Sequence, residues 1–201
     1  MLRHGESEWN AAGRWQGWED VCLTASGEAQ ALARARLLAV AGDFAAVVAS
    51  DLVRAARTAE VVATHLGLSA PVLYPGLRER HGGEWQGHTG AEIDEGWPGM
   101  RDAWRRGEMH SPPGGESDAS VLARVDAALA SACAAVADGA ALVAVTHGGV
   151  LRLVSARAGV SPNSLMPNLG GRWFTFDSDG LHAGGALPPL PEPLEETPDT
   201  E

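Results

Sequence analysis

The stretch "ALVAVTHGGVLRLVSARAG" spans residues 141–159 and contains a strand, a turn and a helix in immediate succession. Its first six residues form a short apolar run, which predicts a buried strand. A Gly-Gly turn follows, and residues 148–159 then have the apolar spacing of a helix. A buried strand that leads straight into a helix is typical of a parallel sheet covered by helices on both faces.

The same alternation of strand and helix recurs along the rest of the chain. Residues 44–50, "FAAVVAS", predict a second buried strand, and residues 51–67 predict a helix that Ser50 or Asp51 caps and Gly67 ends. We therefore expect a three-layer α/β/α sandwich with a mostly parallel central sheet. The other expected elements are helices at 23–41 (capped by Thr24 or Ser26), 99–106 and 117–139, and strands at 70–75 and 172–178.

The chain shows no internal repeat and no sign of a second core, so we expect a single domain over residues 1–186. Residues 76–118 are rich in Gly, Trp and charge and predict an insertion over the edge of the sheet. A connection of this length is usually functional. Residues 187–201, "LPPLPEPLEETPDTE", predict a disordered acidic tail rich in proline. The alternative for this tail is a lid or a docking peptide.

Composition limits the classes of partner. The formal net charge of -11 argues against non-specific binding to nucleic acid or to an anionic membrane. Two cysteines in no metal or redox spacing favour free thiols in a reducing compartment. The start of the chain does not read as a signal peptide, and no apolar stretch is long enough for a bilayer. These observations predict a cytoplasmic protein, and an edge strand with Trp-rich loops would permit a homodimer.

Polar side chains follow four of the predicted strands at the point where each strand ends. Open α/β sheets bind ligands at the carboxyl ends of their strands, so we expect these side chains to meet at one edge. They comprise Arg3 and His4 after the first strand, Arg54 one turn after the second, Glu79 among Arg78, Arg80 and His81 after the third, and His147 after "ALVAVT".

This mixture of groups suits phosphoryl transfer. Guanidinium groups match phosphate oxygens in pairs, and a helix N-terminus adds free N–H groups. A neutral imidazole is a competent nucleophile toward phosphorus. A carboxylic acid can protonate a leaving alkoxide and later accept a proton from water. Together these groups predict a reaction that passes through a phosphohistidine.

Ordered blocks along the chain resemble a known family. "LRHGESEWN", "WQGWEDVCLTASGEAQA", "ASDLVRAARTAE", "LRERHGGEWQG", "PPGGES" and "VTHGGVLRLV" are similar to the signature blocks of the histidine phosphatase superfamily, in its phosphoglycerate-mutase-like branch. The resemblance covers residues 1 to about 175. An isolated RHG triplet would be weak evidence, but the order and spacing of all the blocks make the resemblance specific.

The resemblance implies a role for each matching residue. His4 would be the nucleophile, and Glu79 the general acid that protonates the leaving oxygen. The phosphate pocket would be completed by Arg3, Arg54 and His147, with Asn10 and Gln16 in a phosphate-binding loop. The resemblance implies neither a metal nor a cofactor, and we find no HxxxH or clustered carboxylate pattern.

Further residues are candidates for contact with the substrate. In the mutases of this family an Arg pair placed like Arg105 and Arg106 grips a carboxylate; the alternative is a solvated helix end. His81 flanks the site and is a third candidate. For the seven tryptophans we expect packing under long loops, with Trp85 or Trp97 lining a substrate pocket as the alternative.

Three functions are compatible with these residues. The compact chain and its "GGEWQG" and "THGGVLRL" blocks favour a phosphatase, and "PPGGES" and "HTGAEID" resemble bacterial phosphatases of small phosphorylated metabolites such as glucosyl-3-phosphoglycerate. A cofactor-dependent phosphoglycerate mutase is the alternative. A non-catalytic phosphate-binding module would be expected to lack one of the key residues, and none is lacking.

Members of this family usually carry several apolar residues before the RHG triplet. Here only Met1 and Leu2 precede it, so either the first strand is a stub or the chain as given begins inside the reading frame. A strand is typically about five residues long. We nevertheless expect Met1 to Arg3 to pair within the sheet and His4 to point toward Arg54 and His147.

Overall fold

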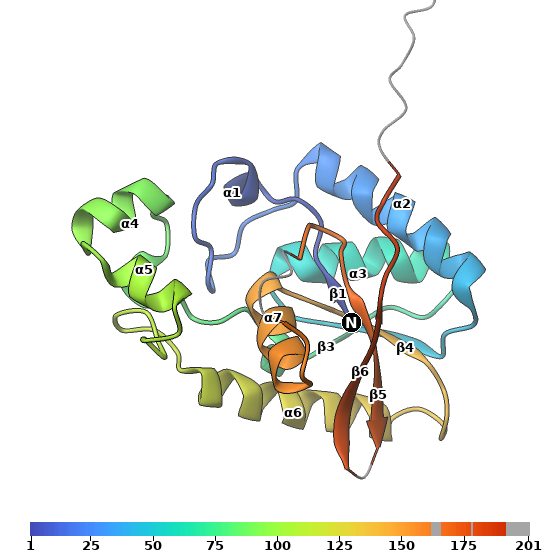
Figure 1. The fold of residues 1–201 in the computed structure, drawn as a ribbon. Helices are drawn as coiled ribbons and strands as arrows, with labels where there is room; N and C mark the ends of the chain where they lie inside the picture. Colours follow the sequence, from blue (N-terminus) through green and yellow to red (C-terminus); the bar gives the residue numbers. More distant parts are fainter. Residues whose placement is uncertain (162–165, 178, 192–201) are drawn as a thin grey trace, which may run out of the picture.

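The computed structural model describes residues 1–161, 166–177 and 179–191. Its main sheet has four parallel strands in the order β1-β4-β2-β3 (Figure 1). This topology confirms the expected parallel sheet. The four strands are β1 (Leu2–Arg3), β2 (Ala46–Ala49), β3 (Val72–Leu73) and β4 (Leu142–Thr146).

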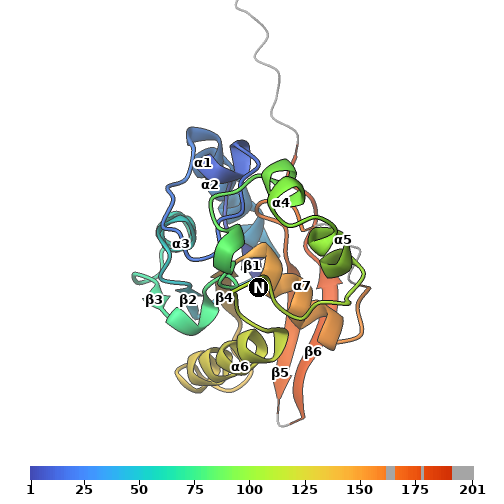
Figure 2. The same ribbon diagram turned by 90° about the vertical axis from the view of Figure 1, so that its left-hand side faces the viewer.

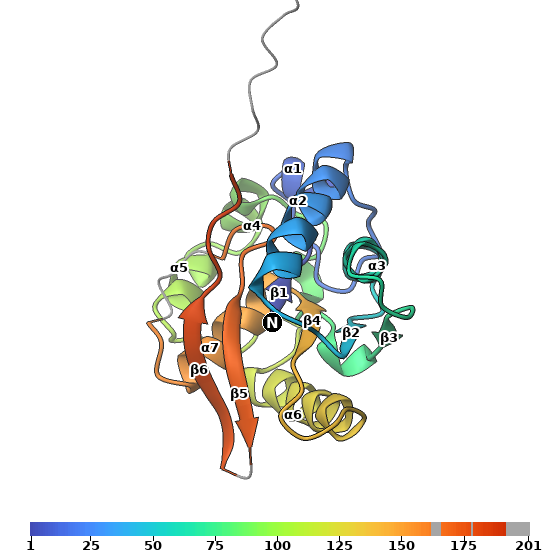
Figure 3. The same ribbon diagram turned by 90° about the vertical axis from the view of Figure 1, so that its right-hand side faces the viewer.

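Helices cover both faces of this sheet and give the expected three layers. In Figure 3, α2 and α3 lie on one side of the strands and α6 lies on the other. The α-helices are α1 (Glu8–Ala11), α2 (Ala25–Ala41), α3 (Val53–His65), α4 (Gly90–Gly96), α5 (Met100–Arg105), α6 (Asp118–Ala134) and α7 (Gly148–Arg157), and two 3₁₀ turns, η1 (Pro75–Leu77) and η2 (Gly83–Trp85), follow β3.

Successive residues of the central strands face opposite cores. Val47 and Ala49 of β2 belong to the core that includes α2 and α3. Val48, between them, packs with residues of α6 and α7, as does Ala144 of β4. Because side chains alternate across a strand, a strand buried on both faces is apolar at nearly every position. This requirement explains the unbroken apolar runs in the sequence.

The first strand is short but lies inside the sheet. Leu2 pairs with Val145 and Arg3 pairs with Thr146 of β4. The backbone N–H of His4 continues this ladder and donates to the carbonyl of Thr146 at 3.0 Å. The expectation that the chain start pairs within the sheet is therefore confirmed for Leu2 and Arg3.

The N-cap predicted from the local sequence is right for α2 and wrong for α3. Thr24 caps α2, as expected, by accepting from the N–H of Gly27. The expected cap of α3 by Ser50 or Asp51 is wrong, because the N-cap residue is Leu52. Ser50 accepts only from the N–H of Leu52, at 3.2 Å, and Asp51 pairs with Arg78 at 2.5 Å. Asp20 instead accepts from the N–H of Val53, the first residue of α3, at 2.6 Å.

The C-terminal part forms an antiparallel hairpin of β5 (Arg172–Asp177) and β6 (Gly180–Ala186), beside β1 (Figure 1). β6 was not expected from its sequence, "GLHAGGA". Hydrogen bonds to the rest of the chain continue just past residue 186: the N–H of Leu187 donates to Gly171, and the carbonyl of Pro188 accepts from Arg34 at 2.8 Å. Of the predicted tail, residues 192–201 lie outside the described part of the chain.

The segment between β3 and α6 contains η1, η2, α4 and α5. Figure 2 shows α4 and α5 on the side of the molecule that carries the carboxyl ends of the strands. An isolated bridge between Arg14 and Thr89 joins this segment to the loop after α1. Within the described residues, no helix is long and apolar enough to cross a membrane.

Candidate active site

A cavity of about 290 Å³ opens at the carboxyl ends of the strands. Its wall comes from the end of β1, the loop after α1, the start of α3, the segment after η1, and the start of α7. The sequence-predicted residues that line it are Arg3, His4, Asn10, Gln16, Arg54 and Glu79.

His4 lies at the end of β1 and is only 2% exposed. Its Nδ1 lies 2.6 Å from the carbonyl oxygen of Gly5. A carbonyl oxygen only accepts, so this contact assigns the proton of the neutral ring to Nδ1 and leaves Nε2 with its lone pair. Burial, with help from Arg54 and Arg3, holds the pKa of His4 well below its usual value. The environment therefore favours an uncharged, nucleophilic imidazole.

His147 occupies the N-cap position of α7 and is fully buried. Its ring centroid lies 5.1 Å from that of His4, in an edge-on arrangement. Neither ring nitrogen has a hydrogen-bond partner among the described residues. Burial, reinforced by the charge of Arg54, lowers the pKa of His147 well below its usual value. The buried imidazoles of His4 and His147 therefore lie side by side, and the ring of His147 has hydrogen-bonding groups that no described residue uses.

Arg3 and Arg54 supply positive charge near His4. Arg3 donates from Nη1 to the carbonyl of Met166 at 2.7 Å. Arg54 donates from Nη1 to Glu19 at 2.7 Å and from Nη2 to Gly17 at 2.8 Å, in both cases to the backbone carbonyl. Burial lowers the pKa of Arg54 to about 10, so it remains a cation at neutral pH. Neither arginine forms an ion pair with a described residue, which leaves their charges for an anion.

Glu79 places its carboxylate at the N-terminus of α7. Its Oε2 accepts from the N–H of Gly149 at 3.0 Å, and its Oε1 accepts from the N–H of Arg80 at 2.9 Å. A Cβ on Gly149 would lie 2.3 Å from Oε1 of Glu79. The second glycine of "THGG" is therefore needed for this close approach.

Asn10 lies in α1 and Gln16 lies in the loop after it, and hydrogen bonds fix both side chains. Ser7 caps α1 through a capping box with Asn10. The Ser7 hydroxyl donates to Oε1 of Gln16 at 2.8 Å, and Asn168 donates to Oδ1 of Asn10 at 3.0 Å. Both predicted loop residues thus reach the cavity from a fixed backbone.

Three predicted substrate contacts do not reach the cavity. Arg105 pairs with Asp102, and Arg106 pairs with Glu108, each with an exposed side chain. The ring of His81 packs edge-on against Trp18 instead. The Arg pair misses the site because successive residues of a helix point about 100° apart. Arg105, the last residue of α5, and Arg106, its C-cap, therefore face solvent, whereas Trp104, one position before Arg105, lines the cavity.

Several lining residues were not expected as site residues. Arg152 is exposed and forms no hydrogen bond or ion pair with a described residue, whereas Arg80 is tied to Asp118. Arg152 lies one helical turn after Gly148 and Gly149, so helical periodicity could have placed it at the site. The unexpected residues with large side chains are Arg14, Trp15, Arg80, Trp104, Arg152 and Met166. Trp85, the alternative pocket residue, is fully buried beneath Trp15 and Trp104.

The two buried histidines predict a dependence of stability on pH. The unfolded chain takes up protons on His4 and His147 as the pH falls through about 6.5, whereas the folded chain, with lowered pKa values, does not. Stability should therefore be lost on acidification, with a slope of up to about 1.4 kcal/mol per pH unit for each histidine.

Chemical denaturation between about pH 7 and about pH 5 measures this slope. The variant His147→Gln should lose stability less steeply than the wild type over this range, because one buried titrating group is gone. A difference in unfolding free energy between the two proteins that does not change with pH would contradict the prediction.

Among the described residues, no group of three or more His, Cys, Asp or Glu side chains is arranged to hold a metal ion. Cys22 and Cys133 are both free, and Cys22 is exposed.

Comparison with known proteins places the chain among phosphoryl-transfer enzymes. A sequence model of the histidine phosphatase superfamily (branch 1) matches residues 1–176. A glucosyl-3-phosphoglycerate phosphatase of Mycobacterium tuberculosis is 39% identical over 85% of this chain and 79% of its own length. A 2,3-bisphosphoglycerate-dependent phosphoglycerate mutase of Methylobacterium radiotolerans is 38% identical over 76% of this chain and 74% of its own.

A solved structure shows the same fold. A mycobacterial glucosyl-3-phosphoglycerate phosphatase in complex with VO3 superposes with a TM-score of 0.80, covers 92% of this chain and 94% of its own, and is 34% identical.

Proposed function

The chain belongs to the histidine phosphatase superfamily, branch 1, and is a phosphatase of small phosphorylated metabolites; we propose that His4 is its phosphoryl carrier. One observation carries the assignment of His4. Its ring is buried and uncharged, with Nε2 unprotonated beside two cations that have no ion-pair partner in the described part of the chain. Such a ring is a nucleophile that needs no separate base to activate it.

In the first half of the reaction, Nε2 of His4 attacks phosphorus and the bond to the ester oxygen breaks. Arg3 and Arg54 stabilise the negative charge on the phosphoryl oxygens, because fixed donors in a buried site act strongly on developing charge. The neutral ring of His147, which has no hydrogen-bond partner among the described residues, can donate its one N–H to one of the same oxygens. Glu79, in its protonated form, donates its proton to the leaving alkoxide, which departs as a neutral alcohol.

In the second half, water attacks the phosphohistidine and the bond between phosphorus and Nε2 breaks. Glu79 is now a carboxylate and accepts a proton from the attacking water. The N–H groups of Gly149 and Arg80 hold both of its oxygens during this step. Inorganic phosphate leaves, and His4 returns to its neutral form.

We propose that the substrate carries a sugar and a carboxylate, as in glucosyl-3-phosphoglycerate, the compound named for the relatives. The indole rings of Trp15 and Trp104 line the cavity and offer flat apolar surfaces to a sugar ring. Arg152 lines the same cavity, forms no ion pair with any residue that the structure describes, and can meet a carboxylate. This role replaces the one expected for Arg105 and Arg106.

Product analysis separates the phosphatase from the mutase. With glucosyl-3-phosphoglycerate and excess chelator, we expect release of inorganic phosphate at an undiminished rate. With 3-phosphoglycerate and 2,3-bisphosphoglycerate, we expect phosphate release to exceed formation of 2-phosphoglycerate. Conversion to 2-phosphoglycerate faster than phosphate release would contradict the proposal, as would loss of activity in the chelator.

A further inference from the structure

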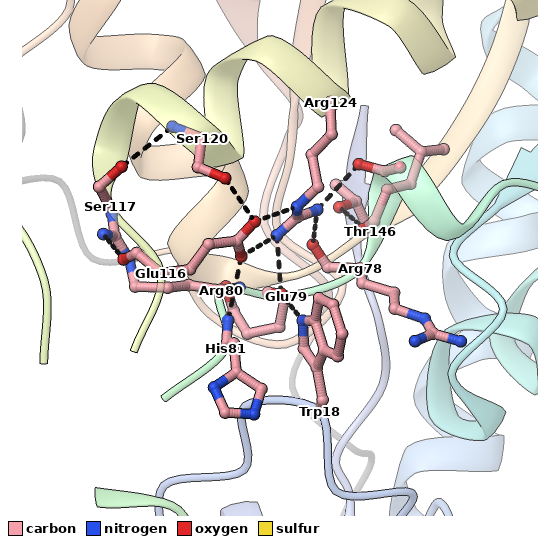
Figure 4. A network of polar contacts seen from close by, with 12 residues as sticks. Trp18, Arg78, Glu79, Arg80, His81, Glu116, Ser117, Ser120, Arg124 and Thr146 are labelled. Atoms are coloured by element: carbon pink, nitrogen blue, oxygen red, sulfur yellow. Dashed lines mark hydrogen bonds and ion pairs between the residues drawn. The ribbon is translucent and has the colours of Figure 1, made fainter. Parts of the chain in front are cut away.

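The "PPGGES" block, residues 112–117, has no part in the chemistry described above, yet its glutamate lies in a polar network beside the site (Figure 4). The network centres on Arg124 of α6. Arg124 donates to three backbone carbonyls of the segment after β3: Gly76 at 2.9 Å, Arg78 at 2.6 Å and Glu79 at 2.9 Å. One guanidinium group therefore fixes the backbone that carries Glu79.

Glu116 fixes Arg124 in turn. The two side chains form a forked pair, with both N···O distances 2.8 Å. Glu116 also accepts from the N–H of His81 at 3.2 Å and from the hydroxyl of Ser120 at 3.2 Å. The side chains of Glu116 and Arg124 are only 14% and 18% exposed. Breaking a largely buried pair by removing one partner is costly, so the pair holds both groups in place.

Backbone hydrogen bonds also hold the residues that follow Glu79. The N–H of Glu84 donates to Pro113 at 2.9 Å, and the N–H of Glu116 donates to His81 at 3.0 Å. A Cβ on Gly83 would lie 2.0 Å from the carbonyl oxygen of Pro113, so the two segments are in close contact. The "PPGGES" block thus packs directly on the residues that follow Glu79.

We propose that Arg124 and Glu116 are positioning residues that hold Glu79 at the place where it donates a proton to the leaving group. This inference rests on the proposed function, because it assigns a purpose to Glu79 as general acid. Catalytic groups must be held to within about 0.5 Å of their productive position. A displacement of about 1 Å costs on the order of 100-fold in rate. The hydrogen bonds of Arg124 and Glu116 give the segment after η1 this precision.

The proposal predicts a dependence on the leaving group. A leaving alkoxide, such as that of a sugar phosphate, is strongly basic and needs a proton as the ester bond breaks. The leaving group of p-nitrophenyl phosphate is a weak base and needs little proton donation. A variant in which Glu79 is displaced should therefore lose more activity on the alkyl ester than on the aryl ester.

The test compares kcat/KM on glucosyl-3-phosphoglycerate and on p-nitrophenyl phosphate for Arg124→Met and Glu116→Gln. We expect a loss of about 10- to 100-fold on the alkyl ester and a loss of a few-fold at most on the aryl ester. Arg157→Met is the matched control, because it removes a forked pair with Asp126 between α7 and α6, away from the cavity. It should leave both rates unchanged.

Glu79→Gln separates failure of the positioning role from failure of the proposed function. Equal losses on both esters in the Arg124 and Glu116 variants, with a selective loss in Glu79→Gln, would overturn the positioning role alone. No selective loss in Glu79→Gln would overturn the role of Glu79 and the inference with it.

A double variant gives an independent readout and does not depend on the stability of Arg124→Met. In the Glu79→Gln background, Glu116→Gln should cause no further loss on the alkyl ester, because both substitutions act through one group. Full multiplication of the two losses would overturn the proposal.

Discussion

Hydrolysis by the His4→Ala variant is expected to fall by at least about 10⁴-fold on every phosphomonoester, because the bond to phosphorus is made by this side chain. The aryl ester should be affected as severely as the alkyl ester, in contrast to substitutions at Glu79. Initial rates of phosphate release with both esters measure the effect.

His65→Ala is the control for this prediction. His65 ends α3 and is exposed, so its removal should leave the rate and the stability of the protein unchanged. Substantial hydrolysis by a folded His4→Ala variant would show that another group, or water, attacks phosphorus directly.

Arg54→Met is expected to lower kcat/KM by about 10²- to 10⁴-fold, since it removes a fixed donor from the charge that develops on phosphate. The substitution also frees the carbonyls of Gly17 and Glu19, which the guanidinium group now ties to α3. Arg54→Lys should recover only part of the activity, because an ammonium group lacks the fork that bridges two acceptors. Steady-state kinetics of the three proteins test this order.

Arg57→Met is the matched control on the same helix. Arg57 is exposed and pairs with Glu28 and Glu60, away from the cavity. Its loss should change activity less than two-fold, because exposed ion pairs contribute little. Equal losses of activity in the Arg54 and Arg57 variants would mean that general destabilisation of α3, and not charge at the site, is responsible.

Elements with a continuous apolar pattern could be predicted from the sequence. β4 and α7 lie within a residue or two of their predicted ends, because a continuous apolar run marks the buried strand and apolar residues at helical spacing mark the helix. The positions of Arg3, His4, Arg54 and Glu79 at one cavity followed from the rule that parallel strands present their carboxyl ends together.

The features that were missed depend on partners distant in sequence. Asp51 is of a residue type that often caps helices and stands at the right place in the sequence. Its carboxylate pairs instead with Arg78, which lies 27 positions away along the chain. β6 contains three glycines and lacks the β-branched residues that mark a strand. Its pairing with β5 comes from the hairpin, not from its own propensity.

The contribution of α5 to the cavity wall also could not be predicted from the sequence pattern. On a helix of six residues, a shift of one position decides whether a side chain meets the cavity or solvent. For this reason Trp104 lines the site where Arg105 was expected. The contacts that hold Glu79 could not be predicted for a similar reason. The residues around "PPGGES" do not reveal that Glu116 pairs with Arg124, or that Arg124 binds the segment after β3.

Direct observation of a phosphoenzyme tests the central claim, that the phosphoryl group passes through His4. The protein is mixed rapidly with substrate, denatured in alkali, in which phosphohistidine survives, and digested for peptide mass spectrometry. We predict a phosphoryl group on His4 in the wild type, a larger amount of it in Glu79→Gln with the aryl ester because hydrolysis is slowed, and none in His4→Ala. Phosphorylation of a different residue, or a phosphoenzyme that still forms in His4→Ala, would contradict the account.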